Sequence, residues 1–263
     1  MTKKSLKYLC KQKNKRKLTC LTAYTTSIAK IIDNHVDMIL IGDSLGSVIY
    51  GMDNTQGVTL DMMMVHGAAV CKTSKKAFTI LDMPYKTYRN KKEALINAKK
   101  LIKFTKCQSL KLEIDKNNTS IVEHLTKNKI NVIAHIGVTP QKFKDFNKIR
   151  SVGKDTKEEE EIIKLAIKLE KVGSSMIVLE CVKEKLARKI TKKVKIPTIG
   201  IGASLACDGQ VLVINDILNI EGVKKMPRFI KSYVNLKKII EKAVINYTTD
   251  VINKKFPKRK NTY

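Results

Sequence analysis

The chain contains no tryptophan, and only 5% of its 263 residues are aromatic. Acidic residues are also scarce, with 24 Asp and Glu against 52 Lys and Arg, and the formal net charge is +28. A nucleic-acid surface gathers basic and aromatic side chains in one stripe, whereas the lysines here are spread over nearly every predicted helix and loop. We therefore interpret them as a solvated coat that binds polyanions weakly, and we keep a basic RNA-binding protein only as a remote alternative.

Long apolar runs and paired cysteines are missing too. No run approaches the ~18 residues that suggest a membrane span, and residues 1–17 lack the apolar core of a secretory signal. The six cysteines are scattered, without a CxxC pair or a histidine at zinc-site spacing. These absences predict a soluble, cytoplasmic protein with reduced thiols, no membrane contact and no specific nucleic-acid partner.

The stretch from Met38 to Gly46 stands out among the residues that are present. Its apolar run ends in an acid, Asp43, and a hydroxyl, Ser44, which lie between two glycines. A buried parallel strand delivers polar groups at its C-terminal end in this way. Asp43 and Ser44 are therefore candidates for the mouth of a cleft, although either side chain is also suited to N-cap the next helix.

Strands and helices alternate along the rest of the chain. Strands are predicted at residues 18–24, 38–41, 77–82, 109–113, 131–135, 175–180, 196–202 and 211–216. Helices are predicted at residues 26–34, 60–72, 91–104, 156–172, 183–191 and 233–247, with loops at 46–59 and 142–154. This alternation predicts a parallel sheet, and eight units in a chain close to ~250 residues predict an α/β (β/α)₈ TIM barrel.

We expect one barrel domain over residues 1–263. Residues 1–17 are basic and have helix-like apolar spacing, so they predict a short N-terminal helix that packs against the bottom of the barrel. Residues 248–263 form a basic C-terminal tail in this prediction.

Polar side chains end most of the predicted strands: Asp43, Asp82, Glu113, His135, Glu180 and Asp216. A barrel gathers the ends of its strands around one mouth, so these side chains are expected to meet there. Alternation along the strand at 109–113 places Lys111 on the same face as Glu113. Converging carboxylates repel one another unless a cation lies among them, and oxygen ligands favour Mg²⁺ over Zn²⁺.

Such a site suits a 2-oxo acid, which chelates a metal through its keto and carboxylate oxygens. The metal acts as a Lewis acid that stabilises the enolate formed when the adjacent carbon loses its proton. In this chemistry Lys111 neutralises the substrate carboxylate, and a separate carboxylate serves as the base.

Several segments carry a resemblance to a known family: Leu21–Tyr24, Gly42–Gly46, Val65–His66, Asp82–Tyr85, Lys111–Glu113, His135–Gln141, Val178–Glu180, Ile199–Ala203 and Cys207–Leu212. Together they resemble the ketopantoate hydroxymethyltransferase family, from about Leu18 to Tyr233. So many motifs in one order make the resemblance highly specific. It implies a barrel of the phosphoenolpyruvate/pyruvate superfamily that assembles into a homodecamer.

The resemblance also implies an activity and roles for named residues. A hydroxymethyl group would pass from 5,10-methylenetetrahydrofolate to 3-methyl-2-oxobutanoate through a Mg²⁺-stabilised enolate, giving 2-dehydropantoate in the first step of pantothenate biosynthesis. The implied ligands of one Mg²⁺ per subunit are Asp43, Asp82 and Glu113. The implied substrate-binding residues are Asp43, Ser44, Asp82, Lys111 and His135, and the implied proton acceptor is Glu180. The alternative is a Mg²⁺-dependent carbon–carbon lyase or mutase of the same superfamily.

The chain departs from the family pattern at a few positions: Thr25, Ile114, Asp115, Ser204 and Asn215. None of these departures removes a residue to which the resemblance assigns a catalytic role. The residues that contact the folate are not assigned from the sequence.

Overall fold

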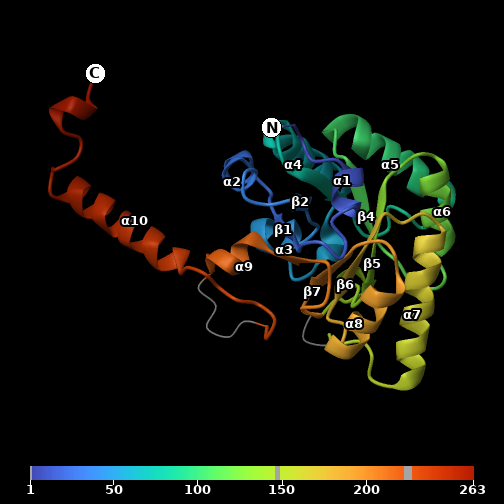
Figure 1. Cartoon of the computed structure of the whole chain (residues 1–263). Coiled ribbons are helices and arrows are strands. Elements are labelled where there is room, and N and C mark those ends of the chain that lie inside the picture. The colour runs from blue at the N-terminus through green and yellow to red at the C-terminus, as the bar shows by residue number, and fades with distance from the viewer. Residues whose placement is uncertain (1, 146–148, 222–226) are drawn as a thin grey trace. The chain divides into compact units, whose positions relative to one another are not determined.

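The computed structural model describes residues 2–145, 149–221 and 227–263. Its centre is a closed barrel whose eight strands follow one another in sequence order, each parallel to its neighbours (Figure 1). The strands are β1 (Leu18–Thr22), β2 (Met38–Ile41), β3 (Phe78–Asp82), β4 (Ser109–Glu113), β5 (Val132–Gly137), β6 (Met176–Glu180), β7 (Thr198–Ile201) and β8 (Gly209–Leu212). The predicted (β/α)₈ barrel is thereby confirmed.

Helices connect most of the strands and pack on the outside of the barrel, which explains why the strands are apolar on both faces. They are α2 (Thr26–Ile32), α4 (Leu60–Thr73), α5 (Lys91–Thr105), α6 (Thr119–Lys127), α7 (Thr156–Lys171) and α8 (Glu184–Lys193). The side chains of Thr59, Asn90 and Asp155 each accept a backbone N–H of the first turn of α4, α5 and α7. These caps satisfy amide groups that have no partner within the helix.

The chain divides into two compact units, Met1–Val213 and Ile214–Tyr263. All eight strands lie in the first unit, so the closed sheet is complete without the second. The second unit contains α9 (Ile214–Leu218) and α10 (Leu236–Ile252), and no residue of α10 is buried. The single domain expected over the whole chain stays a prediction.

Two sequence predictions near the barrel mouth were wrong. Residues 46–59 are not a continuous loop, because they include α3 (Leu45–Tyr50) and the 3₁₀ turn η1 (Thr55–Gly57). The glycine-rich composition hid this short helix, which ends at Gly51 in the left-handed conformation, with φ of 65°. Asp216 does not end a strand, because β8 stops at Leu212 and the backbone enters α9 two residues later.

The last helix also differs from its prediction. It runs from Leu236 to Ile252, so the predicted tail begins inside it. The sequence suggested an earlier end because Thr248 and Thr249 are poor helix formers. The hydroxyl of Thr248 instead donates to the carbonyl oxygen of Val244, 2.8 Å away and one turn back.

The bottom of the barrel is closed by the N-terminal segment. Leu9 of α1 (Leu6–Cys10) is fully buried and belongs to the same apolar cluster as Leu18, Met38 and Phe78, which lie at the beginning of their strands. Burial of one leucine side chain contributes roughly 1.5–3 kcal/mol. The predicted packing of a short N-terminal helix against the bottom is confirmed.

A buried carboxylate ties the same segment to the barrel. Asp37, immediately before β2, accepts hydrogen bonds from both terminal nitrogens of Arg16, at 2.8 and 2.7 Å. The backbone N–H and the hydroxyl of Thr19 also donate to it. Burial opposes ionisation of Asp37, but the bonds from Arg16 and Thr19 outweigh it and leave the pKa of this carboxyl below its ordinary value.

Asp37→Asn is therefore expected to lower the free energy of unfolding by about 2 kcal/mol at pH 7, since hydrogen bonds to charged groups contribute about 1.5–3 kcal/mol. Because the folded pKa lies below the unfolded value of about 3.9, the ionised carboxylate stabilises the fold above that value. This contribution is lost as the pH falls through the folded pKa. Urea denaturation of both proteins at pH 7 and pH 3 measures the difference, which should shrink at pH 3.

The matched control is Asp61→Asn, at a carboxylate whose side chain is 81% exposed beside Lys100. Its effect should stay within about 0.5 kcal/mol, because exposed ion pairs contribute little. An Asp37→Asn loss that is equal at both pH values would contradict the role of the charge.

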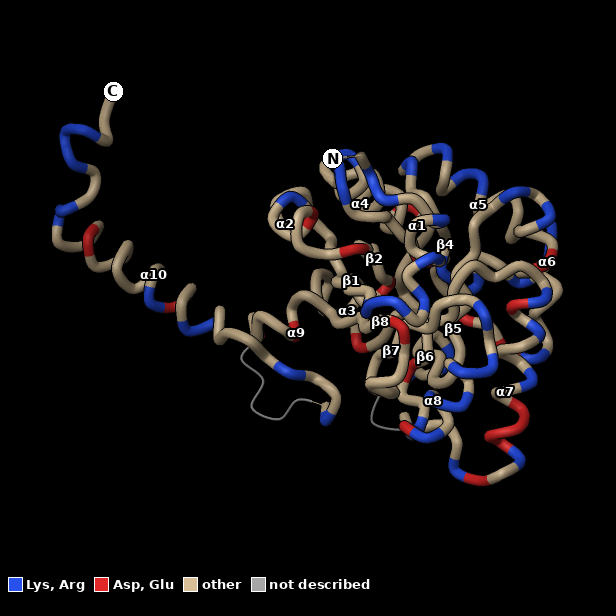
Figure 2. The backbone as a smooth tube through the Cα atoms, viewed as in Figure 1, with Lys and Arg blue, Asp and Glu red and all other residues tan. Residues whose placement is uncertain are grey.

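Charge is distributed over the outside of the barrel unit. Figure 2 shows Lys and Arg on most of its helices, and acidic residues concentrated near the start of α7. No helix in the described ranges is both long and apolar enough to cross a membrane. All six cysteines are unpaired, as predicted.

Candidate active site at the barrel mouth

Five of the predicted strand-end residues come together at the C-terminal ends of the strands. Asp82, Glu113 and Glu180 are the last residues of β3, β4 and β6. His135 lies opposite Glu113 in the register of β4 and β5, and Asp43 follows β2 by two residues. Except for Glu180, each of these residues is at most 6% exposed. They form a polar cluster that is largely buried.

Two glycines allow this close packing. A Cβ on Gly42 would lie only 2.8 Å from Ser44 Oγ and 3.6 Å from Asp82 Oδ2. Gly137 has a φ of 98°, and a Cβ there would overlap the carbonyl oxygen of Glu180. Only glycine accepts both the conformation at 137 and the short approach of the neighbouring strand.

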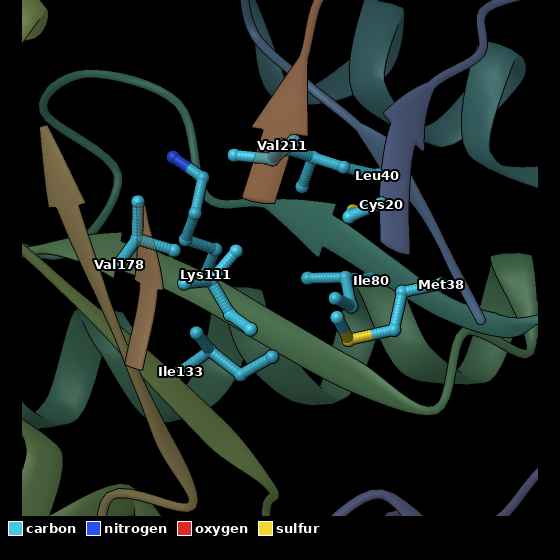
Figure 3. Close-up of a pocket in the computed structure, with 9 residues that line it drawn as sticks. Cys20, Met38, Leu40, Ile80, Lys111, Ile133, Val178 and Val211 are labelled. Carbon is cyan, nitrogen blue, oxygen red and sulfur yellow. The ribbon is translucent and has the colours of Figure 1, made fainter. Parts of the chain in front are cut away.

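Lys111 connects the cluster to the apolar interior of the barrel. Its aliphatic stem lies among apolar side chains, and its nitrogen points away from Met38 and Ile133 (Figure 3). Nζ lies 3.0 Å from Asp82 Oδ1. Burial lowers the pKa of Lys111, but the surrounding carboxylates, Asp82 first among them, outweigh burial and hold it above its ordinary value. Lys111 is therefore a buried cation at neutral pH.

His135 lies between this cation and Glu180. Its Nδ1 is 3.2 Å from Lys111 Nζ, and its Nε2 is 3.3 Å from Glu180 Oε2. Burial, and then the charge of Lys111, lower the pKa of His135, so the ring is neutral at pH 7. An ammonium only donates, so Nδ1 accepts and Nε2 carries the proton that faces the carboxylate. The N–H thus lies beside Glu180, although Nε2 makes no well-aligned hydrogen bond with the described residues.

Acidic groups outnumber basic ones in the cluster. Burial and the neighbouring charge of Asp43 raise the pKa of Asp82 to about 7. The same two causes, burial first, raise the pKa of Glu113 well above its usual range. Lys111 is one ammonium among three buried carboxyl groups, and a bound cation would relieve their repulsion.

The donor set fits a hard divalent cation that shares its ligands with a substrate. Asp82 Oδ1 is buried and accepts no well-aligned hydrogen bond from the described residues, although Lys111 lies nearby. Within residues 2–145, 149–221 and 227–263, no group of three His, Cys, Asp or Glu side chains is placed so that it could hold a metal ion. Mg²⁺ uses one or two carboxylates together with water and substrate oxygens, so an incomplete protein shell suits it.

Sequence reasoning missed three residues at the mouth, one in contact with this cluster and two that contact its neighbours. Gln141 Nε2 donates to Asp43 Oδ2 at 2.7 Å, and the hydroxyl of Tyr88 donates to Gln141 Oε1. The hydroxyl of Tyr24 lies 2.8 Å from Ser44 Oγ. Tyr24 and Gln141 stand within recognised motifs, but nothing in their residue type indicates a role. Nothing in the sequence around Tyr88 indicates a functional role for it.

Ser44 stands at the N-cap of α3 without a side-chain capping bond. The capping interpretation therefore does not account for its hydroxyl, which Tyr24 contacts at the mouth. Thr25, one of the departures from the family pattern, does cap a helix, because its Oγ1 accepts the N–H of Ile28 in α2.

Two of the other departures pair with side chains outside the cluster. Asp115 pairs with Lys142, and Ser204 Oγ donates to Glu184 Oε1 at 2.9 Å. Ile114 is buried, and Asn215 lies on α9 in the second unit.

Comparison with known proteins identifies relatives over the full length of the chain. Residues 3–259 match the family model for ketopantoate hydroxymethyltransferase. A 3-methyl-2-oxobutanoate hydroxymethyltransferase of Pelagibacter ubique (strain HTCC1062) is 49% identical over 263 residues, covering 100% of both chains. The enzyme of the same name from Rhizobium etli is 44% identical over 252 residues, covering 95% of this chain and 92% of its own length.

Solved structures agree on the fold. The crystal structure of phosphonopyruvate hydrolase in complex with oxalate and Mg²⁺ has a TM-score of 0.66 to this chain at 11% identity, covering 99% of this chain and 93% of the other. At that identity the likeness is one of architecture alone. The family assignment depends instead on the sequence matches, which span nearly the whole chain: this protein belongs to the ketopantoate hydroxymethyltransferase family.

Proposed function

We propose that this protein transfers a hydroxymethyl group from 5,10-methylenetetrahydrofolate to 3-methyl-2-oxobutanoate, giving 2-dehydropantoate for pantothenate synthesis. The observation that carries the proposal is the Lys111–His135–Glu180 series beside three buried carboxyl groups at the mouth of the barrel. It supplies a cation for an acid substrate, a base for its proton and ligands for a metal, in a chain whose relatives bear this enzyme's name.

In this proposal Asp43, Asp82 and Glu113 would hold one Mg²⁺ per subunit, which would also bind the 2-oxo acid substrate. A bound divalent cation would act as a Lewis acid at the keto group and so acidify the neighbouring C–H bond. The raised pKa of Asp82, about 7, supports this assignment because a carboxyl group in that state gains from a nearby positive charge.

The protein's own groups perform the proton transfer. Lys111, with Ser44, binds the substrate carboxylate, since it is a buried ammonium held at one side of the cluster. Glu180 accepts the proton from C3, and its Oε2 lies 3.3 Å from Nε2 of the neutral His135. The carbanion carbon then attacks the methylene carbon of the folate. The C–C bond forms as one methylene C–N bond breaks, and the oxygen of water then replaces the second nitrogen at the same carbon. The two released folate nitrogens take up the proton from C3 and one proton from water.

A second candidate is cleavage or rearrangement of a related 2-oxo acid. It is favoured by one observation, the shared architecture with phosphonopyruvate hydrolase, whose structure contains oxalate and Mg²⁺. A lyase or mutase would convert its substrate without a folate. Turnover with and without methylenetetrahydrofolate therefore separates the two functions.

Exchange of the C3 proton tests the first half of the proposed reaction. The protein, incubated with Mg²⁺ and 3-methyl-2-oxobutanoate in D₂O without folate, is expected to replace that proton by deuterium, because Glu180 removes it before the donor is needed. Loss of the C3–H signal in proton NMR measures the exchange. Heat-denatured protein is the control, and turnover without any exchange would contradict a carbanion mechanism.

Assembly and location complete the proposal. We infer a homo-oligomer, a decamer by resemblance to the family, and a cytoplasmic enzyme of biosynthesis. Light scattering coupled to gel filtration measures the mass of the assembly, and a monomeric mass of 29.7 kDa would contradict the first inference.

A further inference from the structure

Gln141 is an uncharged side chain that makes several hydrogen bonds at the mouth. It lies in the 3₁₀ turn η2 (Pro140–Lys142), which follows β5, and only 3% of its surface is exposed. Its Nε2 donates to Asp43 Oδ2 at 2.7 Å and to the carbonyl oxygen of Met83 at 3.0 Å. Its backbone N–H donates to Glu113 Oε2 at 3.1 Å. One residue therefore holds two of the proposed cation ligands.

The orientation of the Gln141 amide follows from its partners. A carboxylate oxygen and a backbone carbonyl oxygen only accept, so both must face the NH₂ group. Oε1 accepts from the hydroxyl of Tyr88, which leaves no polar atom of the amide without a partner. A flipped amide would place its oxygen against Asp43 and leave the Tyr88 hydroxyl facing a donor. The Tyr88 hydroxyl therefore locks the amide in one orientation.

The backbone of η2 is held from the other side. Gln56 of η1 donates from Nε2 to the carbonyl oxygen of Gln141 at 2.9 Å. This contact holds the peptide that follows Gln141, while the N–H of the peptide that precedes it donates to Glu113, so the backbone is held on both sides of Gln141.

Gln141 contacts only one oxygen of each of two carboxylates. Gln141 donates to Asp43 Oδ2 and to Glu113 Oε2 but not to the other oxygen of either carboxylate, and Glu113 Oε1 lies 3.9 Å from His135 Nδ1. Groups that hydrogen-bond to metal ligands set ligand orientation, and their loss commonly lowers metal affinity about 10- to 100-fold.

We propose that Gln141 is a positioning residue that selects which oxygen of Asp43 and of Glu113 is presented to the divalent cation. In this proposal the hydroxyl of Tyr88 holds the Gln141 amide in its orientation. This inference rests on the proposed function, since it requires a cation at these carboxylates. Neither residue touches the reacting atoms; both act through the two carboxylates.

The test is divalent-cation affinity, measured with Mn²⁺ by electron paramagnetic resonance on the purified full chain without substrate. Gln141→Met keeps the length of the side chain and removes the amide, and it should weaken Mn²⁺ binding about 10- to 100-fold. Tyr88→Phe removes only the locking hydroxyl and should weaken binding in the same direction by a smaller factor. Urea denaturation of each metal-free variant reports whether it folds.

The matched control is Gln108→Met at the opposite end of the barrel. Gln108 is also a bridging amide, since its Oε1 accepts from the N–H of Thr79 and its Nε2 donates to the carbonyl oxygen of Lys4. Its loss should affect unfolding without changing Mn²⁺ affinity. In addition, excess Mg²⁺ should restore kcat of Gln141→Met toward the wild-type value, which it would not do if the variant were merely misfolded.

Folded Gln141→Met and Tyr88→Phe proteins that bind Mn²⁺ within twofold of the wild type would overturn the inference while leaving the proposed function in place. A wild-type protein that turns over its substrates but binds no Mn²⁺ or Mg²⁺ would overturn the inference together with the metal part of the proposed function. An equal loss of affinity in Gln108→Met would also overturn it, because the effect would then be one of general stability.

Discussion

Glu180→Gln is expected to lower kcat by roughly 10²- to 10⁴-fold, the usual contribution of a positioned general base. Its amide cannot accept the C3 proton, whereas its size and its contact with the His135 N–H are retained. Steady-state turnover and the C3 exchange experiment should fall together. Mn²⁺ affinity should stay near the wild-type value, because Glu180 lies across His135 from Lys111 and Asp82.

The control for this substitution is Glu160→Gln on the outside of α7. Glu160 pairs with Lys164 one turn away, and its side chain is 60% exposed. Its removal should leave turnover unchanged. If Glu180→Gln kept turnover within tenfold of the wild type, another group would have to be the base, and the proposed role of Glu180 would be wrong.

Asp82→Asn should produce the largest combined effect on metal binding and stability. The amide supplies no anionic oxygen, so affinity for Mg²⁺ should fall. Lys111 loses its nearest counter-ion, 3.0 Å away, while it remains buried. Removal of one partner from a buried ion pair commonly costs about 3–5 kcal/mol, and the lower end is expected here because Asp43 and Glu113 still face the ammonium.

Urea denaturation with and without Mg²⁺ separates the two effects. A ligand that binds only the folded state stabilises it by about 2.7 kcal/mol at a concentration 100 times its Kd. Mg²⁺ should therefore stabilise the wild type and Asp37→Asn, whose change lies at the bottom of the barrel, but not Asp82→Asn. Equal stabilisation of all three proteins would remove Asp82 from the proposed ligands.

Much of the barrel could be predicted because its strands are short apolar runs that end at recognisable polar residues. Asp82, Glu113 and Glu180 ended their runs in the sequence and end β3, β4 and β6 in the structure. Asp216 ended an apolar run in the same way, but the backbone had already left the barrel for α9. A pattern of single residues does not distinguish these cases, since strand pairing and not the run itself decides where a strand stops.

The candidate site was predictable in its charged members and not in its neutral ones. A carboxylate at a strand end is costly to bury, so its presence alone indicates a role. A glutamine or tyrosine carries no such cost once its hydrogen bonds are made. Gln141 and Tyr88 become meaningful only because η2 and the segment after β3 place them against each other and against Asp43.

Local sequence is thus sufficient for the order of the strands and of the longer helices, although it missed α3, α6 and α9. It is also sufficient for the residue types at the mouth and, through its motifs, for the family. The rest requires closure of the sheet, which brings together residues from different strands and loops. Closure thereby produces the Lys111–Asp82 ion pair, the neutral state of His135 and the hydrogen bonds from Gln141 to one oxygen of each of two carboxylates. Burial changes the charge and the partners of each group, and burial depends on the whole barrel rather than on any segment.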